Sequence, residues 1–305
     1  MLKVRIGTRK SKLALWQTEF IAKKIKEFFP EVEIEIVKIT TKGDKILDVP
    51  LAKIGGKGLF VKEIEEALLN NEIDLAVHSL KDVPTYFPDG LGLGAITERE
   101  DPRDCLASIK YNTLEELPNG ATVGTSSLRR KSQLLKLRPD LKIKDLRGNV
   151  DTRLKKLQNG EYDAIVLAYA GLKRLGLDDK ATYIFSPYQF IPAVAQGFLG
   201  IEIRLDDKKT AEIVNKLNHY ESYLRAEAER AFLKRLEGGC QVPLGCYSEI
   251  SGDSITLTGF ISDLSGKRFL KETLKGKKWE YKDLGVKLAE RLLKKGGEEI
   301  LREIY

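Results

Sequence analysis

Two stretches far apart in the chain share one order: a short apolar run, a turn rich in hydroxyl and basic side chains, and an amphipathic helix. The turns are Gly7-Thr8-Arg9-Lys10-Ser11 and Gly124-Thr125-Ser126-Ser127-Leu128-Arg129-Arg130. Apolar residues then recur with helical spacing, over residues 13–28 in the first stretch and about 127–137 in the second. This shared order predicts two similar, doubly wound α/β domains that face each other. The free N–H groups at such helix starts, beside arginine, favour anion binding.

Each pattern continues into a sheet of its own. The first domain is predicted to contain strands at 4–7, 32–36 and 73–77 and a helix at 61–70. The second is predicted to contain strands at 121–124, 142–146 and 164–168 and a helix at 151–158. Residues 91–103 are interpreted as the crossing into the second domain. A strand at 201–205 is expected to return to the first sheet, because the chain must cross back before its third segment.

The third segment predicts a small α+β C-terminal domain. It begins near Glu221 with a helix at 222–236, followed by a strand at 248–250, a hairpin with its turn at 263–266, and helices up to Tyr305. The predicted division is therefore residues 1–97 with 198–217, then 98–197, then 220–305. A chain of 305 residues is long enough for two or three domains.

The composition indicates a folded cytoplasmic protein. Hydrophobic residues make up 42% and charged residues 32% of the chain, and no apolar run has the length of a membrane-spanning helix. The N-terminus lacks the apolar stretch of a secretory signal. Three cysteines are too few for a disulfide scaffold. Two histidines far apart in the sequence and no Cys-x-x-Cys pair argue against a structural zinc site, and no metal is predicted.

Basic residues are dense in one part of a chain whose formal net charge is +7. They are Arg129, Arg130, Lys131, Lys136, Arg138, Lys142, Lys144, Arg147, Arg153, Lys155 and Lys156. Only Asp140, Asp145 and Asp151 oppose them there. A field of this sign attracts an anionic partner, and nucleic acid and a small polycarboxylate or phosphate both remain open on this observation alone.

Lys81 and Asp82 follow the predicted strand 73–77 at its carboxyl end. Ligands bind at this edge in open α/β sheets, so the two residues are candidates for chemistry. A strand-end turn with a solvated ion pair explains them equally well. The glycines of Gly55-Gly56-Lys57-Gly58 lack the spacing of a phosphate-binding loop and are not interpreted as one.

The stretch Gly238-Gly239-Cys240-Gln241-Val242-Pro243 follows the predicted helix 222–236. Two glycines allow a tight loop, and a cysteine held on such a loop is accessible to react as a thiolate. A helix C-cap followed by a buried thiol is the alternative interpretation of the same residues. Cys105 and Cys246 are expected to be structural.

Stretches along nearly the whole chain resemble the porphobilinogen deaminase (hydroxymethylbilane synthase) family of tetrapyrrole biosynthesis. The resemblance is carried by Arg5-Ile6-Gly7-Thr8-Arg9, Leu13-Ala14-Leu15-Trp16-Gln17, Gly55 to Phe60, His78 to Pro84, Arg99-Glu100-Asp101-Pro102-Arg103-Asp104, Gly124 to Arg130, Leu146-Arg147-Gly148-Asn149, Ala168 to Gly176 and Gly238 to Gly245. It is weakest in the third domain outside the Cys240 loop.

The resemblance implies a fold and an activity. The fold is two domains like those of periplasmic binding proteins, with the small C-terminal domain. The activity is the head-to-tail condensation of four porphobilinogen molecules with loss of ammonia, followed by release of linear hydroxymethylbilane for porphyrin and heme biosynthesis. A dipyrromethane cofactor, joined to Cys240 by a thioether, would prime the chain. Asp82 would be the catalytic carboxylate, stabilising positive charge on the pyrrole nitrogens.

The resemblance also implies which residues bind the carboxylates of cofactor and substrate. Cofactor binding is implied for Cys240, Lys81, Asp82, Thr125, Ser126, Ser127, Arg129, Arg130, Arg147 and Gly148. Substrate binding is implied for Arg9, Ser11, Phe60, Arg147, Arg153 and Gln196. The chemistry of the ligands agrees with these assignments, because every pyrrole unit carries an acetate and a propionate, and arginine can bind a carboxylate with two hydrogen bonds. A monomer is expected, with no nucleic acid or membrane as partner.

Three positions depart from the family pattern. Ala195 stands where glycine is frequent, which argues against a left-handed backbone conformation there. Leu80 replaces a commoner methionine and Lys12 a frequent proline, and neither change touches a proposed chemical role.

Two other functions fit parts of the sequence. A two-domain solute-binding protein would clamp a carboxylated ligand, but it would leave Asp82 and Cys240 without a role and would need a secretion signal. A nucleic-acid-binding protein would use the basic stretch 129–156, which contains no aromatic residue on which a base could stack.

Overall fold

The computed structural model describes residues 3–45, 58, 60–237 and 242–304. The chain forms two compact units. The first contains residues 1–48, 56–100 and 197–223, and the second contains residues 49–55, 101–196 and 224–305. Each is described by itself below. None of the helices among the described residues combines the length and the apolar character that a membrane span requires.

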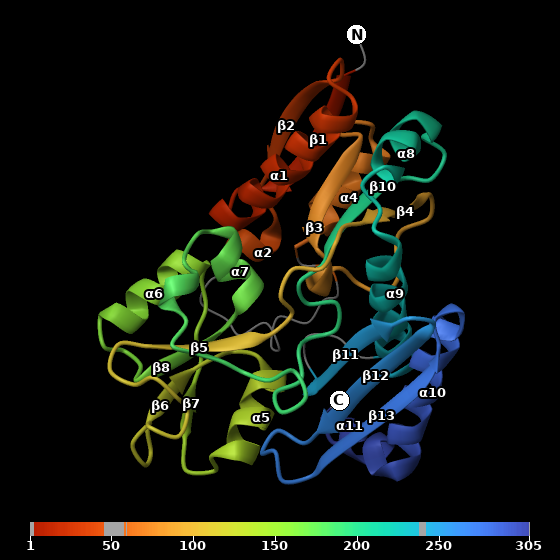
Figure 1. Cartoon of the computed structure of the whole chain (residues 1–305). Coiled ribbons are helices and arrows are strands. Elements are labelled where there is room, and N and C mark those ends of the chain that lie inside the picture. The colour runs from red at the N-terminus through yellow and green to blue at the C-terminus, as the bar shows by residue number, and fades with distance from the viewer. Residues whose placement is uncertain (1–2, 46–57, 59, 238–241, 305) are drawn as a thin grey trace. The chain divides into compact units, whose positions relative to one another are not determined.

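The first unit is built on a five-stranded sheet with the order β2-β1-β3-β10-β4 (Figure 1). Its strands are β1 (Lys3–Arg9), β2 (Glu33–Ile39), β3 (Leu75–Ser79), β4 (Leu91–Ile96) and β10 (Leu199–Arg204). Its helices are α1 (Lys12–Phe28), α2 (Lys42–Lys45), α4 (Lys62–Leu69) and α8 (Lys208–Asn215). Strand β1 pairs in parallel with β2 and β3, whereas β10 runs antiparallel between β3 and β4. The predicted return of the chain to this sheet is thus confirmed.

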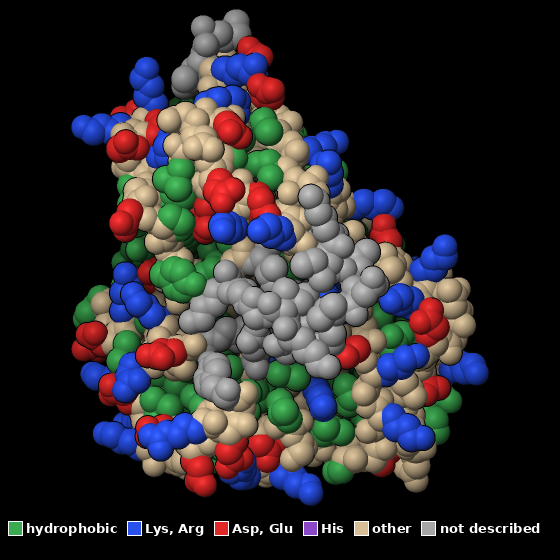
Figure 2. Space-filling model, turned by 180° about the vertical axis from the view of Figure 1, so that it is seen from behind, with side chains coloured by type: hydrophobic (Ala, Val, Ile, Leu, Met, Phe, Trp, Pro, Cys, Tyr) green, Lys and Arg blue, Asp and Glu red, His purple; other side chains and the backbone are tan. Residues whose placement is uncertain are grey.

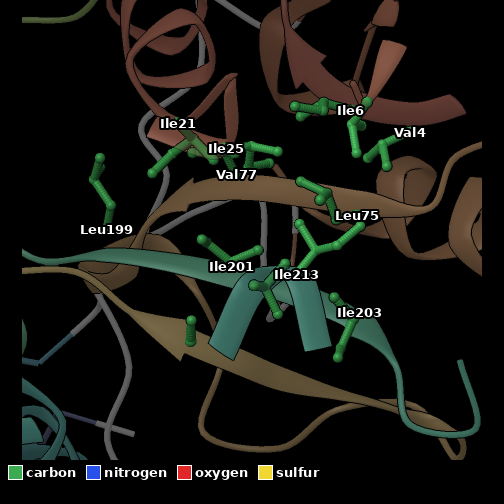
Figure 3. Packing of buried hydrophobic residues seen from close by; sticks show 13 residues of the cluster. Val4, Ile6, Ile21, Ile25, Leu75, Val77, Leu199, Ile201, Ile203 and Ile213 are labelled. Carbon is green, nitrogen blue, oxygen red and sulfur yellow. The ribbon is translucent and has the colours of Figure 1, made fainter. Parts of the chain in front are cut away.

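Strand β3 shows why helices cover both faces of this sheet. Successive side chains of a strand point to opposite faces. Leu75 and Val77 belong to the core formed with Ile21 of α1 and Ile213 of α8 (Figure 3). Ala76, between them, belongs to a separate core with Ile64 of α4. A strand buried on both faces needs the continuous apolar run that this segment has.

The second unit contains a sheet of the same design, with the order β7-β6-β8-β5-β9. Its strands are β5 (Asp104–Ser108), β6 (Thr122–Gly124), β7 (Lys142–Lys144), β8 (Ala164–Ala168) and β9 (Tyr183–Ile184). Its helices are α5 (Leu128–Leu137), α6 (Val150–Gln158) and α7 (Tyr169–Arg174), with a 3-10 turn η2 (Asp178–Lys180). Strand β6 pairs in parallel with β7 and β8, and β5 runs antiparallel between β8 and β9. Two similar, doubly wound α/β sheets are therefore present, as predicted.

The rest of the second unit is a three-stranded antiparallel sheet with helices, which confirms the predicted α+β part. Its strands are β11 (Leu244–Ser251), β12 (Ser254–Ser262) and β13 (Phe269–Lys277). Its helices are α9 (Tyr220–Arg235), which begins in the first unit, α10 (Tyr281–Leu292) and α11 (Glu298–Arg302), with η3 (Lys278–Glu280) and a π-helical turn at Leu293–Gly297. Helix α10 packs against β12 and β13 (Figure 1). Phe260, on β12, belongs instead to a core with Ile191.

Two interpretations of the sequence need correction. Residues 91–96 are strand β4 of the first sheet and not part of the crossing, because Leu91, Ala95 and Ile96 are buried and the strand pairs with β10. The strand was not recognised in the sequence because it contains two glycines, and glycine is depleted in strands. Strand β5 was not predicted either, although it pairs with β8 on one side and with β9 on the other.

Candidate active site

The carboxyl edge of the first sheet brings four predicted site residues to one end of two parallel strands. Gly7 of β1 lies opposite Ala76 of β3, so the strands end at the same edge. Arg9 is the last residue of β1, and Ser11 caps helix α1 by accepting a hydrogen bond from the Ala14 N–H at 3.2 Å. Strand β3 is followed at once by the 3-10 turn η1 (Leu80–Asp82), which carries Lys81 and Asp82. Asp82 is exposed and Lys81 is half-buried.

Several hydrogen bonds fix the backbone that presents Asp82. The Leu80 N–H donates to the Phe198 carbonyl at 3.0 Å, and the Gln17 Nε2 lies 2.8 Å from the Ser79 Oγ. His78 Nε2 and Glu202 Oε2 are 2.8 Å apart, and both side chains are buried. These contacts tie the turn to helix α1 and to strand β10. An exposed carboxylate is thus presented by an anchored backbone.

Arg9 and Phe60 lie against each other in the first unit. The guanidinium carbon of Arg9 is 4.3 Å from the centroid of the Phe60 ring, a cation–π contact. No sequence pattern pairs these two residues, because helix α1, strand β2 and helix α2 lie between them in the chain. Their participation in substrate binding stays a prediction.

The hydroxyl residues after β6 hold the loops at the carboxyl edge of the second sheet. Ser127 caps helix α5 by accepting from the Arg130 N–H at 3.3 Å, and Thr125 Oγ1 accepts from the Ser127 N–H at 3.2 Å. Ser126 Oγ donates to the Leu146 carbonyl at 3.1 Å and accepts from the Leu146 N–H at 3.0 Å. The turn after β6 is therefore joined to the loop after β7, directly before Arg147.

Arg147, Gly148 and Arg153 form one local group at this edge. Gly148 has φ +111, and a Cβ added there would lie 2.8 Å from a side-chain carbon of Thr152. Glycine is therefore needed at this turn. The Arg153 Nε donates to the Gly148 carbonyl at 2.8 Å, which anchors Arg153 on the loop that carries Arg147. Both arginines are half-buried.

Arg129 and Arg130 have a buried partner that the sequence reasoning missed. Asp104 is 0% exposed, and the two arginines are 5% and 6% exposed. Asp104 Oδ2 accepts from Arg129 Nη1 at 2.7 Å, and Oδ1 accepts from Arg130 Nη2 at 2.7 Å and Nε at 3.0 Å. Burial alone would raise the pKa of Asp104, but the two guanidinium groups hold it well below its usual range. One carboxylate thus binds both guanidinium groups.

Gln196 joins this group. Its Nε2 donates to the Pro102 carbonyl at 2.7 Å and to Asp104 Oδ1 at 3.2 Å. The side chain of Gln196 thus contacts the carboxylate that binds Arg129 and Arg130. The substrate-binding role that the resemblance implies for Gln196 stays a prediction. Asp104 is the last residue of the motif Arg99 to Asp104. No sequence pattern indicates that this residue contacts residues 129, 130 and 196, which lie far along the chain.

The backbone conformation of Ala195, next to Gln196, differs from the one expected from the sequence. Its φ is +60, the left-handed conformation that the alanine was expected to disfavour. Such a conformation costs a residue with a Cβ about 1–2 kcal/mol. The Ala195 N–H donates to the buried carboxylate of Glu229 at 2.7 Å, a charge-assisted hydrogen bond that offsets this cost.

Two of the three cysteines lie within the described residues. Cys105 and Cys246 are both fully buried, as expected of structural residues. Burial raises the pKa of the Cys105 thiol to about 12, which disfavours a reactive thiolate. Cys240 and residues 55–57 lie outside the described residues. The role of Cys240 therefore stays a prediction.

The basic stretch 129–156 is not a continuous solvated surface. Arg129 and Arg130 are buried on Asp104, and Arg138 forms an ion pair with Asp140 at 2.7 Å. On the face seen in Figure 2, basic and acidic side chains are interspersed. Part of the positive charge of this stretch is therefore paired with carboxylates, and the identity of its anionic partner stays a prediction.

Two like α/β sheets are present, one ending in an exposed carboxylate and the other in arginine-bearing loops. Ligands of open α/β proteins bind at this edge of the sheet. Residues 4–212 match the family model described as porphobilinogen deaminase, dipyromethane cofactor binding domain. Residues 223–294 match the model described as porphobilinogen deaminase, C-terminal domain. The chain belongs to the porphobilinogen deaminase family, whose members are transferases.

Curated relatives agree over nearly the full length. The porphobilinogen deaminase of Geobacter sulfurreducens is 55% identical over 303 residues, covering 99% of this chain and 95% of the relative. That of Trichlorobacter lovleyi is 54% identical, covering 99% and 97%. Among solved structures, a putative methionine-binding lipoprotein from Bacillus subtilis has a TM-score of 0.45 and 14% identity, covering 71% of this chain and 90% of that one. A periplasmic substrate-binding protein of an ABC transporter from Coxiella burnetii has a TM-score of 0.45 and 16% identity, covering 70% and 91%.

Proposed function

We propose that this chain is a hydroxymethylbilane synthase. It condenses four porphobilinogen molecules head to tail, releases ammonia at each addition, and yields linear hydroxymethylbilane by hydrolysis. The observation that carries the proposal is that the two like sheets end in side chains of opposite charge. The first presents the exposed carboxylate of Asp82 on an anchored turn, and the second presents Arg147 and Arg153 on adjoining loops.

The residues of the second sheet fit a dipyrromethane cofactor by their donor chemistry. Its pyrrole side chains are carboxylates, and the turn after β6 offers hydroxyls while the loop after β7 offers guanidinium groups. Each hydrogen bond from a charged donor to such a carboxylate contributes about 1.5–3 kcal/mol. Thr125, Ser126, Ser127, Arg147 and Gly148 would form this part of the site. The bound cofactor would supply a nucleophilic pyrrole carbon to prime the condensation.

Arg129 and Arg130 would contribute to cofactor binding as a pair already oriented by Asp104. Asp104 accepts hydrogen bonds from both guanidinium groups, which fixes their positions before a ligand binds. Cys240 would attach the cofactor through a thioether, and Lys81 would bind it from the turn that carries Asp82. These roles follow the family positions.

Asp82 would act by its charge and its fixed position. A carboxylate near a pyrrole N–H accepts its hydrogen bond and stabilises positive charge that develops on the ring as ammonia leaves. The hydrogen bonds at Ser79 and Leu80 keep the turn in place, so little reorganisation is required. Arg9, stacked on Phe60, would bind a substrate carboxylate, together with Ser11, Arg153 and Gln196.

We extend the proposal to the organisation of the protein. The division into residues 1–97 with 198–217, 98–197 and 220–305 is supported by three separate sheets. A cytoplasmic monomer fits a biosynthetic enzyme in which Cys105 and Cys246 are both buried. Light scattering coupled to gel filtration tests the monomer, and a stable dimer would contradict it.

Intact-protein mass spectrometry tests the function. The purified chain is expected to carry a covalent adduct of two pyrrole units, and Cys240→Ala to lack both the adduct and turnover of porphobilinogen. Cys246→Ala is the matched control, because it removes a buried thiol and should keep the adduct. An unmodified chain with full activity would contradict the proposal.

A further inference from the structure

Glu229, on helix α9, is a buried carboxylate for which the proposed reaction has no role. It is 0% exposed. Its Oε1 accepts from the Ser248 Oγ at 2.6 Å and from the Ser248 N–H at 2.9 Å, and its Oε2 accepts from the Ala195 N–H at 2.7 Å. One carboxylate therefore joins helix α9 and strand β11 to the segment that ends at Gln196.

The backbone that Glu229 holds is strained. Ala195 has φ +60, and non-glycine residues are held in such conformations only where the surroundings enforce them. The Gln196 N–H donates to the Ala193 carbonyl at 3.0 Å, which closes the turn. The Ala195 side chain is buried, so the turn cannot relax into solvent without opening the packing around it.

Hydrogen bonds continue from this turn to the arginine pair. Gln196 Nε2 donates to Asp104 Oδ1 at 3.2 Å, and Asp104 binds Arg129 and Arg130. Strand β11 also approaches this group directly. A Cβ added at Gly245 would lie 2.5 Å from the Pro192 carbonyl oxygen and 3.2 Å from Arg129 Cδ. Two routes therefore connect β11, the strand that follows the Cys240 loop, to Arg129.

We infer that Glu229 is a positioning residue for the reaction: by holding Ala195 in its strained conformation it fixes Gln196, and through Asp104 the arginine pair. The inference rests on the proposed function, in which Gln196 and the arginine pair bind carboxylates. It adds that the part of the chain bearing Cys240 sets the geometry of the carboxylate site on the second sheet. A cofactor attached at Cys240 would then meet arginines whose positions α9 and β11 determine.

Glu229→Gln tests the inference by keeping the size of the side chain. The amide must turn its NH2 group toward the Ala195 N–H or toward the Ser248 N–H, so one buried donor loses its acceptor. We expect KM for porphobilinogen to rise about tenfold with a smaller change in kcat, which corresponds to the loss of one charge-assisted hydrogen bond. Hydrogen exchange of the Ala195 and Gln196 amides should become faster.

The double variant Glu229→Gln with Ala195→Gly provides the rescue. Glycine adopts φ +60 without strain, so the turn should persist without the carboxylate and KM should return to within about threefold of the original value. Glu227→Gln is the matched control. It removes a carboxylate two residues earlier on α9 that pairs with Arg230 and Lys282, and KM should not change. Should Glu229→Gln fail to fold, Ser248→Ala removes one of its donors and should raise KM in the same direction by a smaller factor.

An unchanged KM and unchanged amide exchange in Glu229→Gln would overturn the inference, even if the thermal midpoint fell, because that pattern means a structural role. A raised KM that Ala195→Gly does not rescue would overturn it as well. Failure of the proposed function looks different: the unaltered protein would not consume porphobilinogen, whereas the amide exchange would still report whether Glu229 holds the turn.

Discussion

The two five-stranded sheets share their strand order and directions but treat charge in opposite ways. In the first, the carboxylate of Asp82 is exposed while the backbone beneath it is held by buried contacts. In the second, Arg129 and Arg130 are buried and Asp104 neutralises one of their charges inside the sheet. A shared topology supplies equivalent strand ends, and the residues placed there decide which sheet offers an anion and which offers cations.

The exposed carboxylate and the buried ion pair should also differ in what they contribute to the stability of the fold. An exposed carboxylate such as Asp82 keeps its hydration, so its removal should affect chemistry more than folding. A buried ion pair has given up hydration, so removing one partner leaves an uncompensated charge inside the protein. Variants of the two aspartates should therefore separate, with one failing in stability and the other in turnover.

Asp104→Asn should have the largest effect of all. Loss of the charge leaves two buried guanidinium groups without their counterion, and such losses cost about 3–5 kcal/mol. Urea denaturation measures the change in the free energy of unfolding. Because the pKa of Asp104 is lowered in the folded state, its stabilisation is present above the ordinary pKa of aspartate and disappears as pH falls through the folded value. Asp140→Asn, at an exposed ion pair with Arg138, is the control and should change much less.

Asp82→Asn should leave the fold intact and remove most of the turnover. Loss of a fixed charge aimed at the reacting group typically lowers kcat by about 10²–10³. Steady-state kinetics and a thermal melt on the same sample measure both sides of the contrast. Asp89→Asn, an exposed aspartate shortly after it on the same segment, should change neither. Near-normal turnover in Asp82→Asn would remove Asp82 from the mechanism.

Arg147→Leu tests the proposed contact between an arginine of the second sheet and a ligand carboxylate. A lost guanidinium–carboxylate contact of about 1.5–3 kcal/mol corresponds to a rise in KM of roughly ten- to hundredfold. Lys142→Leu is the matched control, since it removes the same charge from the opposite end of β7, where no ligand is proposed. Equal kinetics in the two variants would reduce Arg147 to a surface residue.

The sequence could predict the α/β class and the position of most strands because buried parallel strands are continuous apolar runs between turn signals. It missed β4, whose glycines weaken the pattern, and β5, whose partners β8 and β9 lie far along the chain. Asp82 could be proposed because it follows a predicted strand at its carboxyl end, and Arg147 because it lies in the basic stretch and in a motif that resembles the family. The positive φ of Ala195 and the pairing of Asp104 depend on tertiary contacts, with Glu229 and with Arg129 and Arg130, and no local pattern encodes them.

Glu65, on α4, is a partly buried acid that no sequence pattern distinguishes from the other glutamates of this helix. Burial and, to a smaller extent, the charge of Glu202 raise its pKa to about 7, and His78 opposes the rise. The first unit thus contains an acid whose pKa is raised, the reverse of Asp104 in the second unit.

The expected consequence is a loss of stability with rising pH. Between the ordinary pKa of a glutamate and about 7, folded Glu65 retains a proton that the unfolded chain has released, so folding weakens as pH rises through that interval. Glu65→Gln should therefore match the unaltered protein near pH 4.5 and exceed it at pH 8 by about 1 kcal/mol, a value reduced for partial solvent screening. Urea denaturation at the two pH values gives the difference, with exposed Glu72→Gln as the control. If Glu65→Gln gained equal stability at both pH values, the gain would come from packing, and the acid would not be the pH-dependent counterpart of Asp104.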